Sequence, residues 1–115
     1  MALFSRSPRP DERRAEPRRL VDSRGLILSD GQETRCLIVD VSDSGLRIRL
    51  DRSLGLPPVI VVVDLAAGTA CEARVAWTKG HDLGLTCSIK ATPLTGLVPG
   101  RLAAAKDAWM RHRAQ

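Results

Sequence analysis

The feature that most constrains the fold is a strict alternation of apolar and basic residues over positions 46–50. Leucine or isoleucine occupies positions 46, 48 and 50, and Arg47 and Arg49 stand between them. Successive side chains of a β-strand point to opposite faces. The segment therefore predicts a strand that buries one face in a core and turns a basic face to solvent.

Short apolar segments separated by turn residues continue this pattern along the chain. A bulged strand is expected over residues 20–28, ending at the turn dipeptide Asp30-Gly31, with further strands over residues 34–41, 59–65, 71–77 and 83–89. The β-branched run at 59–65 is typical of a strand that is buried on both faces or closes a barrel. About six short strands at regular intervals predict a small antiparallel barrel or sandwich.

A helix is expected at the end of the chain. After Pro99-Gly100, residues 101–113 are rich in alanine and long side chains, which favour helix. Leu102, Ala105 and Trp109 recur at helical spacing on one face. We expect Trp109 to pack against the strands, because a large apolar residue on the only apolar stripe is usually part of a core.

The charge distribution points to a small anionic partner. The 115 residues suffice for one ordinary domain and carry a formal charge of +5. Residues 1–24 hold seven arginines and four acids, and residues 101–115 hold four basic residues and one acid, so the middle is nearly neutral. A basic arm on a neutral body favours a localised anion site over nucleic-acid binding, which usually spreads positive charge over a face.

Residues suited to catalysis or metal binding are scarce. The sequence has no Gly-rich phosphate loop followed by lysine and no histidine pair at metal spacing, and His81-Asp82 is interpreted as a solvated pair in a turn. Cys36, Cys71 and Cys87 are widely separated and are interpreted as small buried hydrophobes rather than a disulfide framework or a metal clip. We expect a protein that is not an enzyme and has no metal or cofactor.

The hydropathy pattern favours the cytoplasm. No apolar run approaches the roughly 20 residues that cross a bilayer, so membrane insertion is not expected. Residues 1–10 also lack the apolar stretch of a secretory leader.

An arginine motif stands just before the first expected strand. Arg14 and Arg18 are separated by three residues, and Arg13 precedes them. Arg9 and Arg13 have the same spacing, but adjacency to the strand favours Arg14 and Arg18. A guanidinium can stack on a base and also bond to phosphate or to the guanine edge. Taken alone, such an arm is more often a solvated basic tail.

A second motif, with Asp40, Ser42 and Gly45, joins two consecutive expected strands. Carboxylate and hydroxyl oxygens can accept hydrogen bonds from the donor groups of a guanine. The same residue types also suit a plain turn, where Asp and Ser bond to nearby backbone amides and Gly accepts positive φ. The motif alone leaves both interpretations open.

Arg-x-x-x-Arg followed by Asp-x-Ser-x-x-Gly resembles the signature of the PilZ family, bacterial receptor domains for the second messenger cyclic di-GMP. Gly84-Leu85 after Trp77 also resembles the closing strand of that family. The resemblance implies an all-β fold, a six-stranded antiparallel PilZ-type β-barrel with a C-terminal α-helix. It divides the chain into a flexible arm (1–12), the barrel (13–90) and a C-terminal helical segment (91–115).

The resemblance also implies the ligand and its site. Cyclic di-GMP would be bound by Arg13, Arg14, Arg18, Asp40, Ser42, Gly45 and Trp77. In the family the arginines wrap over the ligand, and an arginine just before the motif, as Arg13 is here, goes with two stacked ligand molecules. Trp77 is expected either to stack on a base or to fill the core.

We therefore expect a cytoplasmic receptor that relays the level of cyclic di-GMP to an effector protein. One alternative is a PilZ-like adaptor that binds only proteins. The other is a small nucleic-acid-binding barrel, which needs exposed aromatic residues for base stacking. Only Phe4 and two tryptophans are available for that role.

Overall fold

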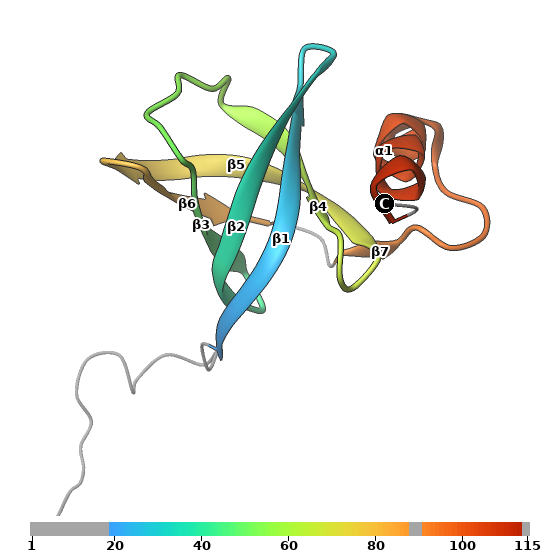
Figure 1. Ribbon diagram of the computed structural model, residues 1–115, viewed down its shortest axis with the longest axis horizontal. Coiled ribbons are helices and arrows are strands. Elements are labelled where there is room, and N and C mark those ends of the chain that lie inside the picture. Colours follow the sequence, from blue (N-terminus) through green and yellow to red (C-terminus); the bar gives the residue numbers. More distant parts are fainter. Residues whose placement is uncertain (1–18, 88–90, 114–115) are drawn as a thin grey trace, which may run out of the picture.

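The computed structural model describes residues 19–87 and 91–113, which form one closed sheet and a helix (Figure 1). The elements are β1 (Arg19–Ser29), β2 (Gln32–Ser42), β3 (Gly45–Arg49), β4 (Val59–Asp64), β5 (Thr69–Lys79), β6 (Asp82–Thr86), β7 (Thr92–Pro93), the 3-10 turn η2 (Gly100–Leu102) and α1 (Ala103–Arg113). The expected flexible arm (1–12) lies outside the described residues, and so do Arg13, Arg14 and Arg18 of the expected barrel segment.

Strand β4 closes the barrel. The strand order is β4-β1-β2-β3-β6-β5, and β4 also pairs with β5, so each of the six strands has a neighbour on both sides. Each of these pairings is antiparallel. The expected six-stranded antiparallel barrel with a C-terminal helix is confirmed, and the sandwich alternative is wrong.

The last strand of the barrel, expected over residues 83–89, ends earlier, at Thr86. Strand β5 extends beyond β6, and its first residues, Thr69 and Ala70, pair with β7. The sequence pattern did not predict β7, since a strand of two residues carries no periodicity.

Two clusters of buried side chains stabilise the fold on opposite faces of β4. Ile60 and Val62 point into the barrel with Ile27, Ile38, Ile48 and Leu85. Val63 instead packs in a second cluster with Leu26, Leu94 and the helix residues Leu102, Ala105, Ala108 and Trp109. Burial on both faces and closure of a barrel were the two alternatives predicted for this β-branched strand, and both occur.

The helix is fixed to the barrel by its apolar stripe and its last turn. Trp109 is 8% exposed, and a Cβ at Gly68 would lie 3.0 Å from its indole ring. The side chains of Arg111 and His112 both contact the carboxylate of Glu33 in β2. The hydrogen bond from Arg111 is the main cause that lowers the pKa of Glu33. No helix within residues 19–87 and 91–113 is long and apolar enough to span a membrane.

Replacing Trp109 by alanine should destabilise the protein by about 3–5 kcal/mol, because it leaves a cavity between the helix and the barrel. Met110→Ala is the matched control, since Met110 is 50% exposed. Urea unfolding followed by circular dichroism measures both. Equal, small losses for the two variants would mean that helix docking contributes little to stability.

Candidate ligand-binding surface

A bulge in β2 places Asp40 on the outer face of the barrel. Ile38 pairs with Ile48, and both are buried in the core. After the bulge Asp40 pairs with Arg47, the residue before Ile48 in β3, whose side chain points away from the core. Asp40 is nevertheless only 6% exposed, so its carboxylate is embedded in this surface.

Asp40 and Trp77 are the two ends of a row of paired residues that runs across β2, β3, β6 and β5. Arg47 pairs with Gly84 of β6, and Gly84 pairs with Trp77 of β5. A second bulge, between Val75 and Trp77, turns Trp77 to the outer face. Three strand spacings separate the ends of the row by roughly 14 Å.

Trp77 is a surface residue. Its side chain is 46% exposed, and a Cβ at Gly84 would lie 2.0 Å from its Nε1 atom. The indole therefore lies directly against the backbone of Gly84, in space that any larger residue at position 84 would occupy. Of the two expectations for Trp77, the core-filling one is wrong, and its ring is accessible for stacking.

Ser42 and Gly45 are paired residues at the ends of β2 and β3. The Ser42 hydroxyl donates a long hydrogen bond of 3.5 Å to the Gly45 carbonyl. Close packing of the strands explains the glycine, since a Cβ at Gly45 would lie 2.3 Å from the carbonyl oxygen of Leu85. Positive φ, expected for a plain turn, does not occur at this glycine.

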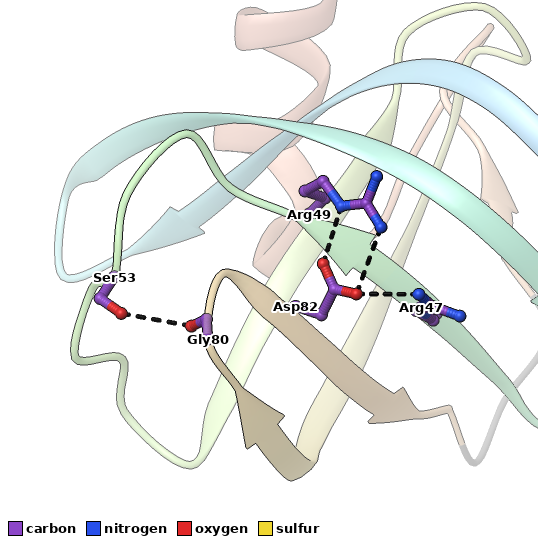
Figure 2. A network of polar contacts seen from close by, with 5 residues as sticks. All are labelled: Arg47, Arg49, Ser53, Gly80 and Asp82. Atoms are coloured by element: carbon purple, nitrogen blue, oxygen red, sulfur yellow. Dashed lines mark hydrogen bonds and ion pairs between the residues drawn. The ribbon is translucent and has the colours of Figure 1, made fainter.

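Arg47, a member of this row, and Arg49 both bind the carboxylate of Asp82 (Figure 2). Arg47 donates to Asp82 Oδ2 at 2.9 Å, and Arg49 donates through Nε to Oδ1 at 2.8 Å. The hydrogen bond from Arg49, followed by that from Arg47, lowers the pKa of Asp82 to about 2. His81-Asp82 is therefore not a solvated turn pair, because Asp82 belongs to β6 and only His81 remains in the turn.

The structure brings Asp40, Ser42, Gly45 and Trp77 to the outer face of the β2-β3-β6-β5 part of the barrel, here called the motif face. Arg13, Arg14 and Arg18 lie outside the described residues. Arg47 is a further residue of the motif face that was not assigned to the site from sequence, although the alternation at 46–50 placed it outward. The described residues contain no cluster of three or more His, Cys, Asp or Glu side chains that could hold a metal ion.

Gly45→Ala should destabilise the barrel by about 1–3 kcal/mol, because the new methyl group forces β3 and β6 apart. Gly55→Ala is the control, since a Cβ there meets nothing within 4 Å and should change stability by less than about 0.5 kcal/mol. Chemical denaturation decides the question. Equal effects would mean that strand contact does not require glycine at position 45.

Asp82→Asn should remove a stabilising contribution that depends on pH. The folded protein holds the pKa of Asp82 at about 2, below its ordinary value of 3.8, so the ion pairs stabilise the fold above pH 4 and are lost as the pH falls towards 2. The stability gap between wild type and variant should narrow over that window in thermal melts. Asp51→Asn, at an exposed position, is the control, and a gap that stays constant from pH 5 to pH 2 would contradict the assignment.

The comparison with known families gives a match along most of the chain. The family model of the PilZ domain matches residues 12–97, which include all six barrel strands and both sequence motifs. A search of curated proteins finds no match. PilZ domains are binding and adaptor modules rather than enzymes, and in general they bind cyclic di-GMP. With the closed barrel and the motif turn as described, the chain belongs to the PilZ domain family.

Proposed function

We propose that this protein is a receptor for cyclic di-GMP that relays the level of the nucleotide to an effector protein in the cytoplasm. The observation that carries the proposal is that the Asp-x-Ser-x-x-Gly residues and the exposed indole of Trp77 share the motif face. One surface thus offers acceptors for a guanine edge and an aromatic ring for stacking, and the arginine motif directly precedes β1 in the sequence.

The turn would recognise the guanine. Asp40 offers carboxylate oxygens and Ser42 offers a hydroxyl, which suit the N–H groups of a guanine. The hydroxyl of Ser42 is held only by a bond of 3.5 Å, so exchanging that bond for a ligand contact costs little. Gly45 lets β3 lie close to β6 beside these two residues.

The arginines would bind from the opposite side. Arg14 and Arg18 are assigned to the phosphates and the guanine faces, because guanidinium groups form bidentate charge-assisted bonds and also stack on rings. Arg13 is assigned to a second stacked nucleotide. The arm would lie over the motif face when ligand is bound. The effector protein would bind to the surface that the arm and the motif face then form together.

A nucleic-acid function has less support. Stacking on single-stranded nucleic acid uses several aromatic residues along a groove. In the part of the chain that the structure describes, Trp77 is the only exposed Trp, Tyr or Phe, since Trp109 is buried.

Calorimetric titration of the full chain tests the proposal. Cyclic di-GMP should bind with a stoichiometry near two, falling towards one in Arg13→Leu, whereas GTP at the same concentration should give no comparable heat. The absence of binding by cyclic di-GMP would overturn the receptor assignment and leave the protein-only adaptor. A stoichiometry of one in wild type would remove only the role of Arg13.

Single substitutions test the residue assignments. Arg14→Ala and Arg18→Ala should abolish or strongly weaken binding, and Ser42→Ala should cost roughly 1–3 kcal/mol of binding free energy. Arg9→Ala and Ser53→Ala are matched controls and should bind as wild type, because Arg9 lies outside the proposed motif and the Ser53 hydroxyl bonds to Gly80, away from the motif turn. Equal losses at Arg9 and Arg14 would show that the arm acts as diffuse charge.

A further inference from the structure

Two of the three cysteines lie in direct contact, although the sequence places them in separate segments. The sulfur atoms of Cys71 and Cys87 are 3.2 Å apart. All three cysteines are free thiols in or against the barrel core, as expected from the sequence, but their spacing did not predict this contact. We propose that Cys71 and Cys87 form an oxidation site, which a hydroperoxide converts to an intrachain disulfide.

The geometry requires only a small movement. Cys71 points into the barrel from β5, and Cys87 directly follows the last residue of β6. A disulfide bond is about 2.05 Å long, so the two sulfur atoms must approach by roughly 1.2 Å. Both residues are free thiols in this structure.

The contact also divides the chemical roles between the two thiols. The hydrogen bond between them lowers the pKa of Cys87 and raises the pKa of Cys71. Cys87 is half-buried, whereas Cys71 is 8% exposed. Cys87 is therefore the attacking thiolate, since the thiolate is the reactive form, and Cys71 is the second, resolving thiol.

The reaction balances with a hydroperoxide as the oxidant. The Cys87 thiolate attacks one peroxide oxygen and the O–O bond breaks; the leaving oxygen takes up from solvent the proton that Cys87 had released, and departs as an alcohol, or as water from hydrogen peroxide. The sulfur of Cys71 then attacks the sulfenic acid of Cys87, the S–S bond forms, and water leaves with the Cys71 proton. Two thiols and one hydroperoxide thus give one disulfide, one alcohol and one water, and thiol–disulfide exchange with a dithiol reverses the reaction.

A cavity lies beside the cysteine pair, on the side of Cys71, whose sulfur contacts that of Cys87. Cys71 lines a cavity of about 380 Å³ together with Val62, Thr69 and Ala91. Cys36 provides an internal control, because burial raises its pKa to about 12. We expect Cys36 to remain reduced under conditions that oxidise the pair.

The site is connected to the motif turn through the backbone. The N–H group of Cys87 donates a hydrogen bond of 2.8 Å to the carbonyl oxygen of Ser44, the residue before Gly45. Drawing Cys87 towards Cys71 moves this donor. Oxidation should therefore alter the environment of the motif turn as well as that of the two cysteines.

Thiol counting on the full chain tests the disulfide. After treatment with hydrogen peroxide and unfolding, wild type and Cys36→Ser should each lose two reactive thiols and two mass units, and dithiothreitol should restore both. Cys71→Ser and Cys87→Ser should form no intrachain disulfide. Loss of one thiol only, loss of the Cys36 thiol, or a disulfide-linked dimer on a non-reducing gel would overturn the proposal.

Amide NMR spectra of the reduced and oxidised chain test the connection to the turn. The signals of Ser44, Gly45 and Cys87 should shift on oxidation of Cys36→Ser and should return on reduction. The same treatment of Cys36→Ser carrying Cys71→Ser should leave Ser44 and Gly45 unchanged. Shifts confined to the barrel interior around the two cysteines would refute the coupling, and neither readout depends on nucleotide binding.

Discussion

Two inserted residues decide which side chains reach the motif face. Without the bulge between Ile38 and Asp40, the alternation of β2 would point Asp40 into the core opposite Leu46. Without the bulge between Val75 and Trp77, the indole would point inward, as Cys71 and Ala73 do. Each bulge reverses the faces of the residues after it, so that the carboxylate and the indole lie on the same outer surface.

Contacts of the neighbouring strands stabilise the part of the barrel between the two bulges. After the first bulge, the next pair of residues, Val41 and Leu46, again packs against the barrel core. Between the bulges lies the close contact of β3 and β6, which only glycine permits at position 45. The ion pairs of Arg47 and Arg49 with Asp82 link the same two strands on the outside (Figure 2).

Most of the fold could be predicted because its determinants are local in sequence. The alternation at 46–50 predicted the inner and outer faces of β3, and the stripe of Leu102, Ala105 and Trp109 predicted the helix face that packs on the barrel. What escaped prediction depends on contacts between distant segments. Trp77 could not be assigned to core or surface, since Cys71, Ala73 and Val75 set an alternation that continues inward to Trp77 until the bulge breaks it. The contact of Cys71 with Cys87 likewise depends on how two strands end, which no spacing of cysteines reveals.

We infer that the arginine motif and the motif turn bind one ligand together. Amide hydrogen exchange with and without cyclic di-GMP tests it most directly, because both segments are followed in one experiment. We expect protection to rise around residues 13–19 and around residues 40–45, while β4, buried on both faces, stays unchanged. Protection that rises at only one of the two segments, or equally throughout the barrel, would contradict it.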